Sequence, residues 1–461
     1  MFDGDIAMLP LNAPVHWLRL RQLCPGGEAL FSIDLDMVMK VLVKLRLRLR
    51  GACIAPMLLA PLILQAAAPV DPLANPPTPA FPGQTRAPAP AAASAVNQQV
   101  VASGLTLPRS LVALPDGNLI VTEGVGTVRI LSPDGKLSQP LPGMPEILSV
   151  AGRSLNDFVI DAKFSENRLV YFTYTAPAKG QKGGARTTQE RDAALAKGAA
   201  FQVDQLARAK LSADLGRIEE VQVLGVIPGR RLVSKADGTL FISTMAFDKN
   251  SAQAQNLQSL AGKFLRINSD GSIPADNPFV GRGMVKQEIF SVGHRDPDGA
   301  AINPVTGELW AIEHGPMGGD EINIIRSGKN YGWPLITYGK EYDGTEIGYS
   351  RRYGLEQPLY YWFPSVAPSG LLFYTGTLFP DWQGDLLIGT LSPTQGRFLV
   401  HLKLNGEKVA SEEHLLVLND RRVRAVAQGA DGAVYVLTDS EDNNQANRHF
   451  PGQVLKLTPP R

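Results

Sequence analysis

The 461-residue chain is poor in cysteine, in net charge and in the common catalytic motifs. Its two cysteines, Cys24 and Cys53, both precede the predicted folded region, so we expect no disulfide framework and no cysteine-based metal site downstream. A formal net charge of +1 leaves no basic surplus to neutralise phosphates, which argues against a nucleic-acid partner. The sequence has no G-x-S-x-G, Walker A loop, G-x-G-x-x-G before a helix, or H-E-x-x-H, which removes the common hydrolase, nucleotide-binding and zinc-protease interpretations.

Residues 1–68 are predicted to be an N-terminal extension that ends in a signal-peptide-like segment. An apolar run, residues 51–68, follows five cations within residues 40–50 and ends in three alanines. This is the order of a secretory signal, so we expect a periplasmic or secreted protein with no stable membrane span after processing. An uncleaved anchor, for which the run is barely long enough, and a cytosolic protein are the alternatives.

Residues 69–98 are rich in proline and alanine and show no apolar periodicity. This composition predicts a semi-extended, disordered linker.

From residue 99 onward one pattern recurs and predicts an all-β domain over residues 99–461. A turn with Gly, Asp or Asn precedes a short strand of large apolar residues, six times at intervals of roughly 50 to 75 residues. The six segments are PDGNLIVTE (115–123), SENRLVYFTYT (165–175), ADGTLFIST (236–244), VTGELWAIEH (305–314), WQGDLLIGTL (382–391) and ADGAVYVLTD (430–439).

A second strand usually follows each segment, as in TVRIL (127–131) and QVLKL (453–457). One such small antiparallel sheet cannot bury both faces alone, and radial packing of several sheets protects their edges. We therefore expect a six-bladed β-propeller of four-stranded antiparallel blades. A β-sandwich or a run of unrelated hairpins is the alternative.

One stretch, EHGPMGGDEINIIRSGKNYGWP (313–334), has the composition of a cation site. Its Gly-Pro step lies beside Asp320 and Glu321, which places backbone carbonyls next to carboxylates. Hard cations such as Ca²⁺ take oxygen ligands of this kind. An ordinary loop between two strands is the alternative.

Two charged clusters could hold an anionic ligand. His294, Arg295, Asp296 and Asp298 share one Gly- and Pro-punctuated turn, in which Arg295 could clamp a carboxylate and His294 could act as a base. A surface Arg–Asp network with a structural histidine is the alternative.

The second cluster contains Arg422 and Arg424, which lie two apart in a predicted strand and therefore share a face. A solvated edge strand is the alternative for them. Aromatic residues in PLYYWFPSVAPSG (358–370) could line a sugar site by stacking or could belong to the core.

Taken together, residues 99–460 resemble the soluble pyrroloquinoline quinone (PQQ) dependent aldose sugar dehydrogenases, the glucose/sorbosone dehydrogenase family. The family fold is a six-bladed propeller, in agreement with the repeat count. The resemblance implies oxidation of a sugar or related alcohol by hydride transfer to PQQ, followed by transfer to an external electron acceptor. It rests on LPDGNLIVTEGVGTVRIL, GKFLRINSDGSIPADNPFVG, IFSVGHRDPDGAAINPVTGELW, EHGPMGGDEINIIRSGKNYGWP, EQPLYYWFPSVAPSG and DGAVYVLTD.

The resemblance also implies which residues hold the cofactors. PQQ would lie over the channel mouth, with Arg295, Arg422 and Arg424 neutralising its carboxylates. Ca²⁺, which polarises the quinone carbonyl, would be held by the backbone carbonyls of Gly315 and Pro316. A further calcium region falls by alignment on Glu321, Tyr331, Tyr342, Asp343 and Glu356.

Several positions depart from the family pattern. The family's general base, a His, is replaced by Ile227 in GVIPGRRLV, and isoleucine cannot accept a proton. Gly152 replaces a Gln of the family, Asp296 and Asp298 replace two neutral amides, and Ser392 replaces a Lys. Because PQQ is a tricarboxylate, added anions and a lost cation would weaken its binding.

Two functions therefore compete. The first is a PQQ- and calcium-dependent oxidoreductase of the soluble aldose sugar dehydrogenase type. The second is a non-catalytic propeller that binds calcium and carbohydrate and has lost the catalytic His.

Overall fold

The computed structural model describes residues 75–460, except 151–153, 198–199, 393, 419–420 and 440–450, together with two strands near the N-terminus. The chain divides into two compact units, residues 1–68 and 69–461. In the first, β1 (Trp17–Cys24) and β2 (Gly27–Asp34) form an antiparallel pair. The signal-peptide-like segment lies outside the described residues. Within the described part of the chain, no helix is long and apolar enough to cross a membrane.

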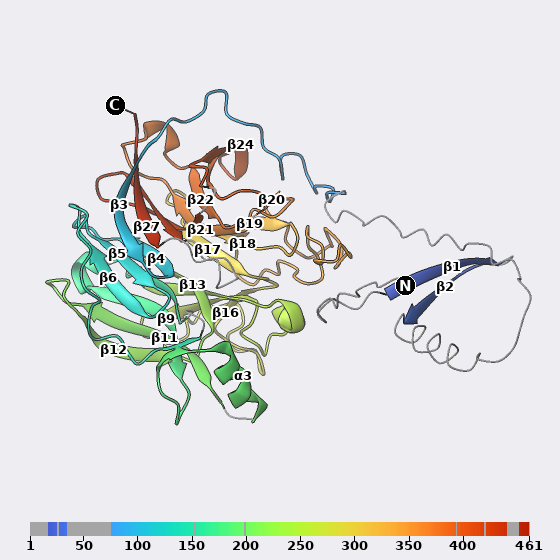
Figure 1. Ribbon diagram of the computed structural model, residues 1–461, viewed down its shortest axis with the longest axis horizontal. Coiled ribbons are helices and arrows are strands. Elements are labelled where there is room, and N and C mark those ends of the chain that lie inside the picture. Colours follow the sequence, from blue (N-terminus) through green and yellow to red (C-terminus); the bar gives the residue numbers. More distant parts are fainter. Residues whose placement is uncertain are drawn as a thin grey trace, which may run out of the picture. The chain divides into compact units, whose positions relative to one another are not determined.

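Residues 97–458 form six antiparallel blade sheets around a central axis, which confirms the six-bladed β-propeller (Figure 1). A short parallel pair, β7 (Leu148–Val150) and β10 (Gly184–Arg186), lies outside the blades. Each sheet begins with an inner strand next to the axis, and the six inner strands pack side by side in a closed ring. The inner strands are β4 (Pro108–Ala113), β8 (Leu155–Ile160), β13 (Gly229–Ser234), β17 (Pro297–Ile302), β21 (Pro368–Phe373) and β25 (Arg422–Gln428).

The six repeats seen in the sequence are the second strands of the six blades. Their central residues are fully buried because neighbouring blades cover both faces of each strand. The second strands are β5 (Leu119–Glu123), β9 (Leu169–Pro177), β14 (Thr239–Thr244), β18 (Leu309–Glu313), β22 (Leu386–Thr390) and β26 (Val434–Asp439).

The third and fourth strands complete the blades. The third strands are β6 (Thr127–Leu131), β11 (Gln202–Leu211), β15 (Lys263–Asn268), β19 (Asp320–Ile325), β23 (Leu399–Asn405) and β27 (Gly452–Thr458). The outer strands are β12 (Ile218–Gly225), β16 (Ile289–Val292), β20 (Tyr360–Trp362), β24 (Lys408–Leu415) and β3 (Asn97–Leu105).

The blade that begins with β4 has three regular strands among its described residues rather than the predicted four. An irregular segment takes the fourth position, where Ser138 N donates to Ile130 O and Leu141 N donates to Val128 O, each at 2.8 Å. Proline has no N–H to donate to a ladder, so Pro140 prevents a regular outer strand in this segment.

The ring is closed by the N-terminal strand of the propeller. β3 pairs antiparallel with β27, so that the last blade has the order β25, β26, β27, β3. The two ends of the propeller chain therefore belong to one sheet, which leaves no open blade at the closure.

All six inner strands have an irregularity in register near their first residues. Such bulges bend a strand and redirect its side chains. The side chains at the starts of the inner strands are thereby turned toward the axis, where the candidate site lies.

Of the predicted disordered linker, residues 69–98, the structure describes residues 75–98, and part of this segment is hydrogen-bonded to the propeller. Residues 77–94, which we call the N-terminal strap, contact β20 and β24, and β3 begins at Asn97. Tyr361 OH donates to Pro77 O (2.8 Å), and Glu412 N donates to Pro88 O (2.9 Å). Proline lacks an N–H but keeps its carbonyl, so a Pro-rich segment can accept hydrogen bonds from the outer strands.

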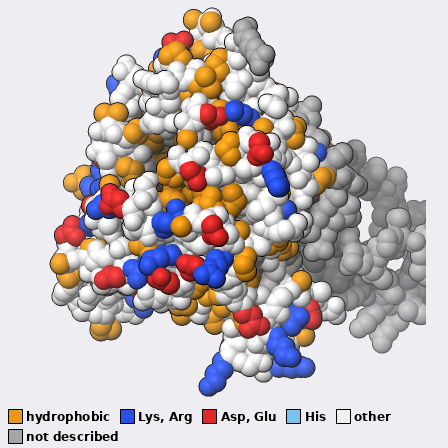
Figure 2. Space-filling model, turned by 90° about the vertical axis from the view of Figure 1, so that its left-hand side faces the viewer, with side chains coloured by type: hydrophobic (Ala, Val, Ile, Leu, Met, Phe, Trp, Pro, Cys, Tyr) orange, Lys and Arg blue, Asp and Glu red, His pale blue; other side chains and the backbone are white. Residues whose placement is uncertain are grey.

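The helices are short and lie in connections: α2 (Phe164–Asn167), α3 (Thr188–Ala196), and the 3₁₀ helices η1 (Asp248–Gln255) and η2 (Pro380–Trp382). α3 lies in the connection between β9 and β11, and β11 begins at Gln202. α3 starts with a capping box and buries no residue, in keeping with a surface excursion. Figure 2 shows cationic and anionic side chains interspersed over one face of the molecule.

Candidate functional site

Charged side chains from four inner strands meet at one end of the propeller axis, which we call the mouth. They line a small cavity of about 30 Å³. Each lies at or near the start of its inner strand, where the register is irregular. The lining residues are Arg109, Asn156, Arg230, Arg231, Asp298 and Arg424.

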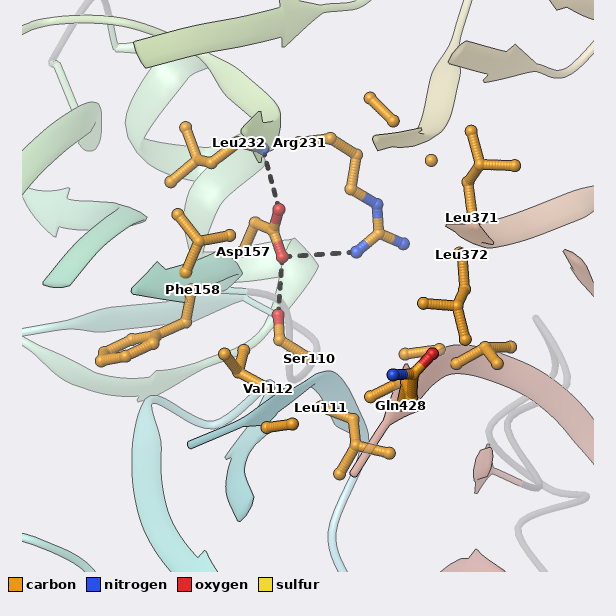
Figure 3. A pocket seen from close by; sticks show the side chains of 18 of the residues that line it. Ser110, Leu111, Val112, Asp157, Phe158, Arg231, Leu232, Leu371, Leu372 and Gln428 are labelled. Carbon is orange, nitrogen blue, oxygen red and sulfur yellow. Dashed lines mark hydrogen bonds and ion pairs between the residues drawn. The ribbon is translucent and has the colours of Figure 1, made fainter. Parts of the chain in front are cut away.

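A larger cavity of about 430 Å³ runs between the inner strands, and Asp157 lies at its polar end (Figure 3). Ser110 Oγ donates to Asp157 Oδ1 (2.7 Å), and Leu232 N donates to Asp157 Oδ2 (2.8 Å). Arg231 Nη1 lies 3.5 Å from Asp157 Oδ1. Burial raises the pKa of Asp157 despite these partners. Arg231 lines both cavities, so its side chain lies between the larger cavity and the small cavity of the mouth.

Asp298 is the most heavily paired anion of the mouth. Its carboxylate lies 2.8 Å from Arg231 Nη2, 3.5 Å from Arg230 Nη2 and 3.8 Å from Arg424 Nη1. Burial acts to raise the pKa of Asp298, but the surrounding cations, Arg230 first among them, outweigh it and hold that pKa well below its usual range. Asp298 is therefore a carboxylate whose negative charge is already compensated.

Asp296 also has a cationic neighbour. Arg230 Nε lies 3.3 Å from Asp296 Oδ1, and His314 Nδ1 lies 3.8 Å from Asp296 Oδ2. Arg230 is the second residue of GRRL, so the loop that lacks the family's His supplies an arginine to both aspartates. The expected excess of negative charge at Asp296 and Asp298 is thus offset within the chain itself.

Arg422 and Arg424 converge on one carboxylate, as their spacing predicts. Arg422 Nε and Nη2 lie 2.6 and 2.9 Å from the two oxygens of Asp439, and Arg424 Nε lies 3.2 Å from Oδ2. Both arginines are buried, so they do not belong to a solvated edge strand. Burial acts to raise the pKa of Asp439, but the positive charges of Arg424 and Arg422 outweigh the effect of burial, so that pKa is lowered.

Arg295 contacts the loop of residues 314–320, which we call the mouth loop. Its Nη1 donates to His314 O (2.8 Å) and to Gly315 O (3.1 Å), so two carbonyls converge on one cationic nitrogen. Its guanidinium also lies over the rings of Phe247 and Trp333. Its Nε has no hydrogen-bond partner among the described residues and is buried.

His294 is fully buried and lies behind Arg295. Its Nε2 is 2.8 Å from Ser291 Oγ, its Nδ1 is 3.1 Å from Glu313 Oε1, and its ring stacks on Tyr331 at 4.7 Å. Glu313 Oε2 in turn accepts from Arg295 N (2.9 Å). Both ring nitrogens of His294 are engaged and its side chain has no exposed surface, and its link to the Arg295 backbone runs through Glu313.

Ile227 lies in an apolar cluster between two blades and is 7% exposed. Its neighbours in that cluster include Tyr171, Leu206 and Leu232. Ser392 is buried, and its backbone N–H donates to Val366 O. The family's Gln position, Gly152, lies outside the described residues.

Each of the five residues of the further calcium region contacts different neighbours. Glu321 Oε2 accepts from Asn323, Tyr331 OH donates to Ile324 O, and Asp343 accepts from Thr345. Tyr342 is exposed, and Glu356 pairs with Lys329 at 3.0 Å. In the described part of the chain, no three His, Cys, Asp or Glu side chains are grouped as a metal site would require.

Sequence reasoning missed several residues of the mouth: Arg109, Asp157, Arg230, Arg231 and His314. The Arg-Arg pair in GRRLV could have signalled Arg230 and Arg231, since paired cations next to an expected ligand site favour anion binding. Arg109 and Asp157 are single charges on irregular strands, and no local pattern marks them. The aromatic run Tyr360–Phe363 is buried and belongs to the core.

Three comparisons place this architecture among known proteins. Residues 105–447 match the sequence model of the family described as "Glucose / Sorbosone dehydrogenase". An aldose sugar dehydrogenase of Escherichia coli is 36% identical over 80% of this chain and 94% of its own length. The crystal structure of the soluble E. coli aldose sugar dehydrogenase in its apo-form covers 79% of this chain and 100% of that chain, with 34% identity and a TM-score of 0.68. The PQQ-bound aldose sugar dehydrogenase of Streptomyces coelicolor shares the fold, with 22% identity, a TM-score of 0.58 and coverage of 79% and 99%.

Proposed function

Because the chain belongs to the glucose/sorbosone dehydrogenase family, we propose that it oxidises a sugar or a related alcohol with PQQ bound at the mouth. The observation that carries this proposal is the convergence of six arginines on four aspartates there, with Arg295 Nε buried and without a hydrogen-bond partner among the described residues. The arginines are Arg109, Arg230, Arg231, Arg295, Arg422 and Arg424, and the aspartates are Asp157, Asp296, Asp298 and Asp439.

The residues present fit a small polycarboxylate. Arg295 has a buried Nε without a hydrogen-bond partner among the described residues, and guanidinium groups bind carboxylates through two parallel hydrogen bonds. Arg295, Arg424 and Arg422 would hold the carboxylates of PQQ, with Arg230 as an added cation. When bound, PQQ supplies the electron-accepting quinone that no protein side chain provides.

Calcium fits the same loop through backbone oxygens. The carbonyls of His314 and Gly315 already turn toward one cationic nitrogen, Arg295 Nη1, and hard cations bind carbonyl oxygens of this kind. We propose Gly315 and Pro316 as the calcium ligands implied by the family resemblance. Binding there would require the Arg295 guanidinium to leave Gly315 O, which would release it toward the anionic ligand.

The proton of the substrate hydroxyl needs an acceptor other than Ile227. His314 Nε2 donates to Pro368 O (2.8 Å), which leaves Nδ1 as the unprotonated nitrogen of the neutral ring. The side chain is 17% exposed and borders Asp296. We assign proton acceptance to His314 Nδ1, where the negative charge of Asp296, 3.8 Å away, would stabilise the imidazolium that forms.

A non-catalytic propeller that binds calcium and carbohydrate is the second candidate. The observation that favours it is Ile227, which lies in an apolar cluster where the family has a base. The signal-peptide-like segment predicted in residues 37–68 is compatible with either function and, if it acts as an export signal, would place the protein in the periplasm or outside the cell.

Reconstitution decides between them. Purified protein would be titrated with PQQ by calorimetry in CaCl₂, then assayed for dye reduction over a panel of aldoses and alcohols. Saturable PQQ binding with substrate-dependent dye reduction supports the dehydrogenase, and His314→Gln should then lower kcat by roughly 10²-fold or more. Binding without turnover for every substrate would favour the non-catalytic propeller, and no binding would remove PQQ from the account.

A further inference from the structure

The N-terminal strap has one fully buried side chain, Gln84. Gln84 Nε2 donates to Pro358 O (2.9 Å), and its Oε1 accepts from Ala80 N (2.7 Å). Its backbone carbonyl accepts from Tyr361 N (2.8 Å). Gln84 thus joins the strap to β20 and to the loop that precedes β20.

Two stacked tyrosines lie next to Gln84. The rings of Tyr338 and Tyr361 are 4.0 Å apart and nearly parallel, and Phe363 packs with them. The Tyr338 hydroxyl donates toward both Gln84 Oε1 (3.1 Å) and Gln357 Oε1 (2.6 Å). The position of Tyr338 therefore depends on a residue of the strap.

The same tyrosine segment packs against the mouth loop. A Cβ at Gly319 would clash with the backbone of Tyr338, and a Cβ at Gly339 would clash with Pro316, so no side chain separates the two segments. Gly319 N also donates to Trp362 O (2.7 Å). Close backbone contacts of this kind transmit displacement, because packed interiors have little free volume.

We propose that Gln84 is a positioning residue for the mouth, acting through Tyr338 on the mouth loop. The mouth loop carries Gly315 O, which Arg295 Nη1 contacts at 3.1 Å in the chain without ligand and which the proposed function assigns to calcium. The proposal rests on the proposed function for the identity of the ligands, PQQ and Ca²⁺. The positioning itself is a property of the chain without ligand.

Two variants and one control test this in the full-length protein. Gln84→Ala removes the buried amide, and Tyr338→Phe removes only the hydroxyl while it keeps the stacked ring. Ser94→Ala is the matched control, because Ser94 tethers the same strap to Glu413 of β24, in a different blade from the mouth loop. Each protein would be measured by hydrogen–deuterium exchange without ligand and by calorimetric titration with CaCl₂ and with PQQ.

We expect faster hydrogen–deuterium exchange of residues 315–320 in Gln84→Ala and Tyr338→Phe than in the wild type, but no change in Ser94→Ala. It also expects roughly three- to thirtyfold weaker PQQ or calcium binding in the first two variants, the range covered by couplings of this type. Equal exchange in all three variants and the wild type would overturn the positioning role. If the wild type binds neither probe, the proposed function fails, and the exchange data still decide the role of Gln84.

Discussion

Arg230 lies 3.3 Å from Asp296 and 3.5 Å from Asp298, so one arginine of the GRRL segment faces both aspartates that replace the family's neutral amides. Arg231 and Arg424 also lie near Asp298, so the two aspartates belong to a paired Arg–Asp group rather than to an isolated anionic defect. Burial would lower the pKa of Arg230, but Asp296 and Asp298 outweigh it and raise that pKa, which keeps the guanidinium charged.

The double variant Asp296→Asn, Asp298→Gln should bind PQQ more tightly and be less stable. Removing two anions near Arg295 should favour a tricarboxylate by about 1 kcal/mol or more, while unpaired arginines should cost the fold about 1–3 kcal/mol. Calorimetric titration and urea denaturation measure the two effects. Adding Arg230→Gln is the control, and it should reverse part of both. Unchanged PQQ affinity in the double variant would show that these side chains do not sense the ligand.

Ile227→His should destabilise the protein and should not restore a base. From sequence alone the substitution promises a gain in kcat, but the structure places this side chain in an apolar cluster with 7% exposure. A buried imidazole without a partner should cost about 1–3 kcal/mol. Thermal melts and dye-reduction kinetics test this, with Ile227→Val as a control that keeps the site apolar. A clear rise in kcat would mean that position 227 reaches the substrate.

Lys263→Met should destabilise the loop of residues 245–262 and should not affect the catalytic step directly. Lys263 is fully buried, and its Nζ donates to the carbonyls of Gln253, Ala254 and Ala261 at 2.7–2.9 Å. Methionine fills the volume but leaves three acceptors unsatisfied, so we expect a loss of roughly 2–4 kcal/mol. Chemical denaturation gives the number, and exposed Lys249→Met is the matched control. Equal stability of the two variants would contradict the structural role of Lys263.

Burial lowers the pKa of Lys263 to about 7, which makes the stability of this loop depend on pH. The unfolded lysine titrates near 10.4, so between these two values the unfolded chain binds more protons than the folded chain. The contribution of Lys263 to stability should therefore rise as the pH increases from about 7 to about 10. Lys263→Met should remove that slope in melts recorded over the same range.

Glu321→Gln should stabilise the calcium-free protein at neutral pH. Burial, and then the charge of Glu313, raise the pKa of Glu321. A raised folded-state pKa means that stability falls as the pH rises from the unfolded value through the folded one. Melting curves in chelator from pH 4.5 to 8 should show a smaller loss for the variant, by about 1.4 kcal/mol for each unit of pKa shift removed. Parallel curves would show that Glu321 does not titrate in this window.

Calcium removal should lower the melting temperature of the wild type. A ligand that binds only the folded state stabilises it by about 2.7 kcal/mol at a hundredfold excess over Kd. Calorimetry with CaCl₂, with chelator and with MgCl₂ as the control measures this. An unchanged melting temperature in saturating Ca²⁺ would remove the metal from the proposed function.

The sequence by itself determined the blade count and the family. The second strands are covered on both faces by neighbouring blades, so they must be apolar throughout, and that requirement repeats visibly along the chain. It also suggested Arg295, Arg422 and Arg424 as candidate ligands of an anion, and their role remains a prediction. It predicted one outer strand too many, since Pro140 interrupts the ladder of the blade that begins with β4.

Only the tertiary structure decided how the mouth is built. Its lining comes from bulged starts of inner strands, where the regular period of a strand fails and no local pattern indicates which side chains face the axis. The pairing of Arg230 with Asp298 and the burial of Ile227 depend on contacts between blades. Gln84 reaches Pro358 across 274 residues of sequence. Hydrogen bonds over such separations depend on the tertiary fold, so local sequence does not reveal that a Pro- and Ala-rich segment resembling a linker is part of the propeller.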